Sequence, residues 1–197
     1  AISEDQEDSD SGEKLSKYVR EVEPYEELVG RNEEIGKILR VLCRKQKNNA
    51  LIVGGRGVGK TALARGISHV LQREEVPAKL KESILIELNI NALLSGTQYR
   101  GDLEGRVQEV METIRDAGDM IVYIDELRSL GGTSKTDDSS KDILSLLIPY
   151  FKSSDIKFLL SATPEDIKKL SNTDSGTLGL FRQIDIEEPS PEEAETI

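Results

Sequence analysis

Cysteine and histidine are almost absent from this sequence, which has one of each among 197 residues, Cys43 and His69. A single cysteine cannot form a disulfide within the chain, and it suits a reducing compartment. We interpret Cys43 as a small buried residue on a helix. No set of metal-ligating residues surrounds His69, so this side chain is expected on the solvated side of a helix.

Long apolar runs and an excess of basic over acidic residues are also missing. No run approaches the length of a membrane span, and no signal-peptide pattern opens the chain. The formal net charge is −11, which argues against a nucleic-acid partner, because neutralising phosphates needs clustered Lys and Arg. Much of the acidic excess lies in Glu4–Asp10 and Glu187–Glu195. These absences predict a soluble cytoplasmic protein that binds neither a membrane nor nucleic acid.

A glycine-rich stretch of the form G-x-x-x-x-G-K-T lies between an apolar strand, Ala50–Val53, and an expected helix, Thr61–Val70. Its glycines let the backbone curl with N–H groups pointing inward and come close to phosphates. The helix start adds unpaired N–H groups and the positive end of a dipole. This context favours phosphate binding over a plain turn without a ligand. The residues predicted to contact a nucleotide are Gly54, Gly55, Arg56, Gly57, Val58, Gly59, Lys60, Thr61 and Ala62.

Two side chains of this loop have defined chemical roles in the prediction. Lys60 would neutralise the β- and γ-phosphates, and the Thr61 hydroxyl would ligate Mg²⁺. The second half of the site is expected after the apolar run Met120–Ile124, which ends in Asp125 and Glu126. Asp125 would hold Mg²⁺ through its water shell, and Glu126 would act as general base on an attacking water.

Weaker signals surround this acid pair. The alternative, two acids that merely begin a loop, is disfavoured by the apolar run before them and the phosphate loop upstream. Thr163 follows the next expected strand and could place a hydroxyl near the γ-phosphate. It could equally be an ordinary helix N-cap, with Pro164 at the first helical position.

Strands alternate with helices along the chain, which predicts an α/β fold with a parallel sheet. Residues 1–13 are acidic and poor in large apolar groups, so they are expected to be disordered. Lys14–Glu23 is predicted as a weak helix ended by Pro24. Expected strands are Ala50–Val53, Ser83–Leu88, Met120–Ile124, Ile156–Leu160 and Arg182–Ile186; expected helices are Glu33–Lys45, Thr61–Val70, 102–117, Asp142–Phe151 and one from Pro164; expected loops are Asn89–Gly101, Gly131–Lys141 and Asn172–Gly179.

The most specific stretch is Leu94–Glu104, which reads L-S-G-T-Q-Y-R-G-D-L-E. It is close to the G-T-x-Y-R-G-x-x-E pore segment of the Clp-type chaperone ATPases, the ClpA, ClpB and ClpC unfoldases and disaggregases. Over roughly residues 25–195, the chain resembles the first AAA+ module of these proteins. Further matching stretches are Val29–Arg31 with Glu33 and Glu34, Lys47–Asn49, Gly59–Ala62 and Ile184–Ser190.

The resemblance implies the large α/β subdomain of an AAA+ P-loop NTPase, a five-stranded parallel sheet in the order 5-1-4-3-2 between helices. It implies a hexameric ring that couples hydrolysis of ATP, with Mg²⁺, to threading unfolded or aggregated protein through a pore. A peptidase or an adaptor is a further candidate partner. By matched position, Tyr99 would grip the substrate, with Arg100 beside it, and Thr163 would be sensor 1. Leu28, Val29 and Gly30 would line the adenine pocket.

Three departures from the family pattern stand out. The family usually has two arginines just before the phenylalanine that opens the last strand, and one of them reaches the neighbour's γ-phosphate. Gly179 and Leu180 occupy those positions, and Arg182 follows the phenylalanine. An arginine finger can contribute several powers of ten in rate. Leu127 and Arg128 stand where the family commonly has Ile or Ala and then His.

The third departure concerns domain organisation. We expect an acidic flexible segment over 1–23, the large subdomain over 24–190, and the start of a truncated small subdomain over 191–197. Without the helical subdomain that covers the nucleotide, the isolated chain should bind nucleotide weakly and turn over little.

Other functions stay open at this point. A regulatory subunit could bind ATP and rely on other subunits for arginine fingers. A DNA-processing AAA+ protein is disfavoured by the acidic balance, and a small-molecule kinase would need an acceptor pocket that the sequence does not indicate.

Overall fold

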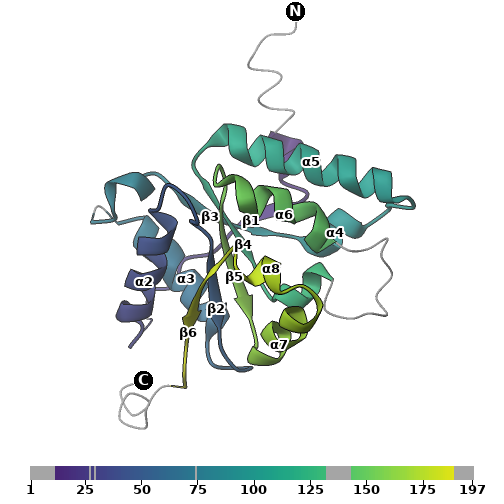
Figure 1. The fold of residues 1–197 in the computed structure, drawn as a ribbon. Helices are drawn as coiled ribbons and strands as arrows, with labels where there is room; N and C mark the ends of the chain where they lie inside the picture. The colour runs from purple at the N-terminus through teal and green to yellow at the C-terminus, as the bar shows by residue number, and fades with distance from the viewer. Residues whose placement is uncertain (1–11, 27, 29, 74, 132–142, 189–197) are drawn as a thin grey trace, which may run out of the picture.

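The computed structural model describes residues 12–26, 28, 30–73, 75–131 and 143–188. Within them, a single sheet has helices on both faces (Figure 1). Parallel strands need both faces covered, because helical crossovers connect them. Two apolar cores result, one on each face of the sheet.

The sheet has six strands in the order β1-β3-β4-β5-β2-β6. All neighbouring strands are parallel except β1 and β3. The five parallel strands confirm the expected α/β fold and the order 5-1-4-3-2, which corresponds here to β6-β2-β5-β4-β3. The strands are β1 Val19–Glu21, β2 Ala50–Val53, β3 Ile84–Leu88, β4 Met120–Ile124, β5 Lys157–Ala162 and β6 Arg182–Asp185.

The added antiparallel strand β1 corrects the prediction of a weak helix over Lys14–Glu23. Only residues 12–15 are helical there, and Val19 pairs with Leu88 at the edge of the sheet. Leu15 and Val22 are buried. The edge of β3 offers unpaired backbone groups, and pairing with them outweighs the weak helix preference of a short polar segment. The expected domain limits at 23 and 190 stay predictions.

Helices α2 and α3 cover one face of the sheet, and α4 to α7 cover the other (Figure 1). Two short helices, α4 and α8, lie in stretches expected as loops. Each begins at a polar cap, Asn89 or Asp174, whose side chain accepts backbone N–H groups. They are too short to show a helical repeat in the sequence. The helices are α2 Asn32–Leu42, α3 Lys60–Leu71, η1 Ala78–Leu80, α4 Ile90–Leu94, α5 Arg100–Ala117, η2 Leu127–Leu130, α6 Ile143–Ser153, α7 Pro164–Thr173 and α8 Ser175–Leu178.

The central strand β4 is buried on both faces, as its apolar run predicted. Ile121 and Tyr123 pack with α2 and α3, and Val122 and Ile124 pack into the opposite core. The expected loop Gly131–Lys141 lies outside the described residues except for Gly131.

Register brings the carboxyl ends of three strands together. Val53 pairs with Ala162, and Ile124 pairs with Leu160. The segments that follow β2, β4 and β5 therefore leave the sheet side by side. These segments are the phosphate loop, the acid pair and Thr163.

Candidate nucleotide-binding site

The glycine-rich loop adopts the backbone conformations that its sequence predicted. Gly57 and Gly59 have φ angles of +75° and +102°, which side chains with a Cβ rarely adopt. Gly54 lies against its neighbours, since a Cβ there would come within 2.7 Å of the side chains of Ile186 and Val58. The sequence of the loop thus determines a tight turn between β2 and α3.

Lys60 closes this turn. Its Nζ donates to the carbonyl oxygens of Gly54 at 2.7 Å and Gly55 at 2.8 Å. Helix α3 starts at Lys60 after the left-handed Gly59, and no side chain among the described residues caps it. The first N–H groups of α3 and the ammonium therefore sit at one place, which suits an anion such as a phosphate chain.

Asp125, the first residue of the acid pair, lies beside the residue that follows Lys60. Thr61 Oγ1 lies 3.5 Å from Asp125 Oδ2. Asp125, Thr61 and Tyr123 all border one cavity of about 300 Å³. Two stretches that lie 64 residues apart in the sequence thus form one site.

The residues present fit Mg²⁺. This ion is usually held by one or two carboxylates together with substrate phosphates, and not by an all-protein cage. Asp125 and Thr61 supply one carboxylate and one hydroxyl at adjacent positions. No group of three or more His, Cys, Asp or Glu side chains suited to a metal occurs in the described ranges.

Two hydroxyls that sequence reasoning missed hold Asp125. Tyr123 Oη and Ser161 Oγ each donate to Asp125 Oδ1 at 2.9 Å. Burial, followed by the charge of Asp125, raises the pKa of the Tyr123 phenol, so this group stays a donor at neutral pH. A polar Ser in an otherwise apolar buried strand was the available sequence signal for Ser161.

Glu126 has an unusual backbone. Its φ of 66° is positive, which is rare for a residue that is not glycine. Its N–H donates to Ser161 Oγ at 2.9 Å, and its carbonyl accepts from Ser129 Oγ at 2.8 Å. The carboxylate pairs with Arg128 at 2.8 Å, and this hydrogen bond raises the pKa of the guanidinium. Both side chains are partly exposed, and such a pair is weak.

Thr163 caps α7. Its hydroxyl accepts from the N–H of Asp166 at 3.2 Å, and the Asp166 carboxylate accepts from the N–H of Thr163 at 3.4 Å. This capping box was the structural alternative in the sequence prediction. Thr163 also directly follows Ala162, which pairs with the last residue of β2, and its sensor role stays a prediction.

The predicted adenine-contacting segment lies against α3. Leu28 packs on Gly66, where a Cβ would approach its Cδ2 to 2.6 Å, and Gly30 has a φ of +76°. Val29 lies outside the described residues. Arg31 connects this segment to the phosphate loop, because its Nη2 donates to the carbonyl of Val58 in that loop at 3.2 Å. The same Nη2 donates to the carbonyl of Glu187 at 2.7 Å.

The predicted pore residues stand apart from the phosphate loop. Tyr99 is 73% exposed at the start of α5. Arg100 donates to Glu104 at 2.9 Å and to Ser145 at 3.2 Å. Figure 1 shows the turn between α4 and α5 at the side of the molecule opposite α2. The exposure of Tyr99 excludes the alternative that it is a loop tyrosine packed against its own domain.

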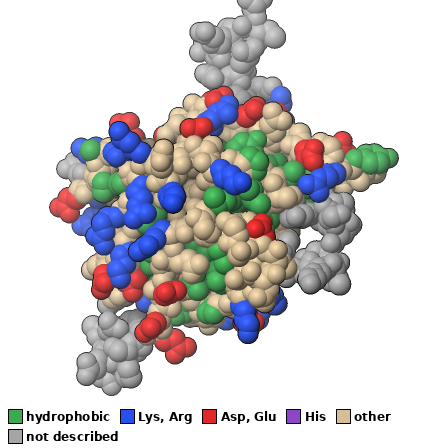
Figure 2. All heavy atoms as spheres, viewed as in Figure 1, with side chains coloured by type: hydrophobic (Ala, Val, Ile, Leu, Met, Phe, Trp, Pro, Cys, Tyr) green, Lys and Arg blue, Asp and Glu red, His purple; other side chains and the backbone are tan. Residues whose placement is uncertain are grey.

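Arg182 does not join the acid pair of its own chain. It pairs with Ala50 at the opposite ends of β6 and β2 from the phosphate loop. Its side chain borders a cavity of about 470 Å³ with Lys37, Arg40 and Arg44, and Figure 2 shows basic side chains gathered over this part of the molecule.

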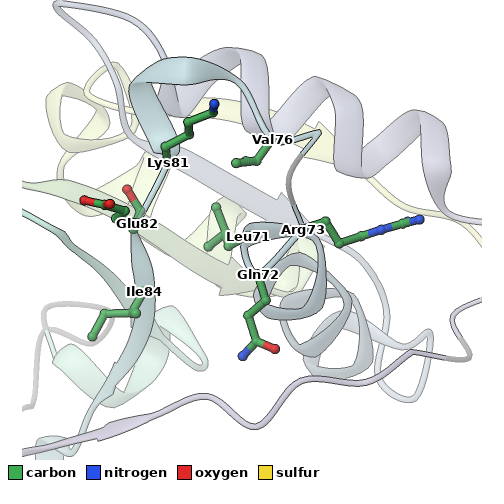
Figure 3. Close-up of a pocket in the computed structure, with 8 residues that line it drawn as sticks. Leu71, Gln72, Arg73, Val76, Lys81, Glu82 and Ile84 are labelled. Atoms are coloured by element: carbon green, nitrogen blue, oxygen red, sulfur yellow. The ribbon is translucent and has the colours of Figure 1, made fainter.

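A larger hollow, of about 710 Å³, lies between the end of α3 and the start of β3 (Figure 3). Leu71, Val76 and Ile84 give it apolar surface, and Arg73 and Lys81 give it charge. It opens at the amino ends of the parallel strands, so it takes no part in the site around Lys60.

A parallel sheet with a glycine-rich phosphate loop opposite a strand-end carboxylate defines a P-loop NTPase. The chain belongs to the family described as "ATPase family associated with various cellular activities (AAA)", whose model matches residues 50–185. No helix in the described ranges is long and apolar enough to cross a bilayer.

Particular relatives are Clp-type proteins. The chain is 36% identical over 167 residues to "ClpA homolog protein" of Fuscovulum blasticum, covering 85% of this chain and 21% of that protein. It is 35% identical over 171 residues to "Chaperone protein ClpB" of Lactococcus lactis subsp. cremoris, covering 86% and 20%. A structure of Hsp104 with ATPγS and FITC casein superposes with a TM-score of 0.80 at 28% identity, covering 93% of this chain and 32% of that one. The chain thus spans 20–21% of the length of these curated relatives.

Proposed function

We propose that the chain is the ATP-binding and ATP-hydrolysing module of a Clp-type protein unfoldase or disaggregase. The observation that carries this proposal is the approach of Thr61 Oγ1 to Asp125 Oδ2, at 3.5 Å. It puts the two ligand types that hold Mg²⁺ in P-loop NTPases in one site. The similarity to ClpA and ClpB proteins supports the proposal, as does the Hsp104 structure with ATPγS and casein.

Each residue of the site has one role in the proposed hydrolysis. The loop N–H groups and Lys60 bind the phosphates, and Thr61 and Asp125 hold Mg²⁺, which neutralises charge on the transferring phosphoryl group when bound. Glu126 orients the attacking water and takes its proton. Thr163 senses the γ-phosphate. Leu28, Val29 and Gly30 contact the adenine.

The proposed oligomeric state, substrate and partners rest on the similarity to the Clp proteins. We infer a hexameric ring that threads unfolded or aggregated polypeptide past Tyr99 and Arg100, with a peptidase or adaptor as partner, in the cytoplasm. A flat amphipathic ring can grip many sequences by apolar contact without reading any one of them. The regulatory, non-hydrolysing alternative is not favoured by the relatives that the chain matches.

Replacement of Lys60 tests the nucleotide site. Lys60→Ala removes the ammonium that bridges the loop carbonyls, so binding of labelled ATP should fall below detection. Lys168→Ala is the control, because Lys168 is exposed on α7. Equal affinity of the Lys60 variant and the wild type would refute the site.

Replacement of Tyr99 tests the threading role separately. In the full-length ring, Tyr99→Ala should leave ATP affinity unchanged and stop translocation of an unfolded fluorescent substrate. Tyr25→Ala is a matched control, since Tyr25 is the other exposed large hydrophobic side chain in the described residues, at 38%. Normal substrate unfolding by the Tyr99 variant would remove this residue from the mechanism.

A further inference from the structure

A single hydroxyl, that of Ser161, links the two acids of the proposed site. Ser161 lies one residue past the Ile124–Leu160 pair, on the strand next to β4. Its Oγ donates to Asp125 Oδ1 at 2.9 Å and accepts from the N–H of Glu126 at 2.9 Å. The Ser161 hydroxyl therefore donates its hydrogen to the carboxylate of Asp125 and accepts, through its oxygen, from the backbone of Glu126.

The carboxylate of Asp125 is divided between two tasks. Oδ1 accepts from both Ser161 and Tyr123, each at 2.9 Å. Oδ2 faces Thr61 at 3.5 Å. One oxygen is thus held by the protein, and the other remains on the side of the phosphate loop.

Burial makes this arrangement rigid. Ser161 is 0% exposed and Tyr123 is 2% exposed, so water does not compete for their hydroxyls. Buried hydroxyls need partners, and both bond to the same oxygen of Asp125. The carboxylate consequently accepts hydrogen bonds from two fixed directions, which sets its orientation.

The backbone of Glu126 is also held from two sides. Ser161 bonds its N–H, and Ser129 bonds its carbonyl. Between these bonds the residue keeps a φ of 66°, a conformation that persists only when its surroundings impose it. Ser161 therefore sets where the side chain of Glu126 leaves the chain, relative to Asp125.

We propose that Ser161 is a positioning residue, which holds Asp125 toward the magnesium site and Glu126 toward the water with one hydroxyl, and that Tyr123 assists it at Asp125 only. This inference rests on the proposed function. Partners of metal-binding side chains typically contribute 10- to 100-fold in metal affinity or activity.

Two variants separate the effect on Asp125 from the effect on Glu126. Ser161→Ala removes the bond to Asp125 and the bond from the Glu126 N–H, whereas Tyr123→Phe removes a bond to Asp125 and keeps the Ser161 hydroxyl that accepts from Glu126. The measurements are binding of a fluorescent ATP analogue to the 197-residue chain during a Mg²⁺ titration, the same binding in EDTA, and hydrogen exchange of the Glu126 amide.

We expect both variants to raise the Mg²⁺ concentration at half-maximal binding by roughly tenfold, with binding in EDTA unchanged. The Glu126 amide should lose protection in Ser161→Ala and keep it in Tyr123→Phe. Ser161→Thr, which keeps the hydroxyl, should restore both properties.

A wild-type Mg²⁺ midpoint for Ser161→Ala would overturn the inference while leaving the ATP site intact. An equal loss of affinity for the ATP analogue with Mg²⁺ and in EDTA would overturn the inference too, because it would indicate a general structural defect. If Ser161→Ala fails to fold, the nearly isosteric Tyr123→Phe decides the Asp125 half through its midpoint. Absence of nucleotide binding by the wild-type chain would refute the proposed function itself.

Discussion

The segment after β4 and the segment between α8 and β6 differ in what their side chains contact. After β4, the carboxylate of Asp125 accepts hydrogen bonds from the buried hydroxyls of Tyr123 on β4 and Ser161 on β5. Before β6, the packed groups are apolar, and the ring of Phe181 meets that of Phe151 edge to face at 4.9 Å. The first segment orients chemical groups, and the second anchors the last strand to the core.

This difference teaches how the proposed reaction is divided. In the proposed site, this chain supplies the residues for the magnesium and the water, which are Thr61, Asp125 and Glu126. At the positions where the resemblance predicts arginines, it has Gly179 and Leu180, and Leu180 packs against the core. In the proposed ring, a neighbouring copy of this chain would therefore present Gly179 and Leu180 where the family presents arginines. The next three predictions test this division.

The largest expected effect is at the acid pair. Glu126→Gln keeps the shape of the side chain but removes the base, so in a full-length ring phosphate release should fall by about 10²- to 10⁴-fold, with ATP affinity retained. Glu165→Gln is the control, because Glu165 is an exposed acid on α7. Turnover of the Glu126 variant within twofold of the wild type would place the base at another residue.

A gain of ATPase activity is expected from a substitution in the segment between α8 and β6. Gly179 is exposed and has a φ of −65°, which any residue adopts. Gly179→Arg restores a guanidinium at a family finger position and should raise ATP turnover by about tenfold or more in a ring, since complete fingers contribute about 10³-fold or more. Gly179→Lys supplies charge without the planar fork and should raise turnover less. No increase with either variant would show that this segment does not face a neighbouring site.

The smallest effect separates the two roles of Thr163. Thr163→Ala removes the cap of α7 and should lower the free energy of unfolding by about 1 kcal/mol, measured by urea denaturation. Thr163→Asn should restore stability, because Asn is also a good cap. Turnover that recovers together with stability would leave Thr163 as a cap only, whereas turnover that stays low in the stable Asn variant would assign it the sensor role.

Much of the site could be predicted because its signals are local. Gly57 and Gly59 stand at the two loop positions where φ is positive, a conformation that favours glycine. Lys60 and Thr61 follow them directly and begin helix α3. The apolar run before Asp125 predicted a strand with both faces covered, which the structure confirms.

The missed features depend on contacts between distant parts of the chain. The strand β1 forms because β3 would otherwise be an open edge of the sheet. No residue pattern within Lys14–Glu23 indicates that this edge is available. In the sequence, Ser161 and Tyr123 look like ordinary strand residues. The pairing of β4 with β5 in the folded sheet brings both hydroxyls to Asp125.

Sequence alone therefore predicted the phosphate loop and the acid pair, since residue type and periodicity act over a few neighbours, whereas the order of the parallel strands was predicted only by the resemblance to the Clp-type ATPases. Only the tertiary structure decided that Thr61 faces Asp125, that Ser161 joins Asp125 to Glu126, and that Arg182 lies at the opposite end of the sheet. The physical reason is that these relations are set by strand register and burial, which belong to the packed sheet and not to any one segment.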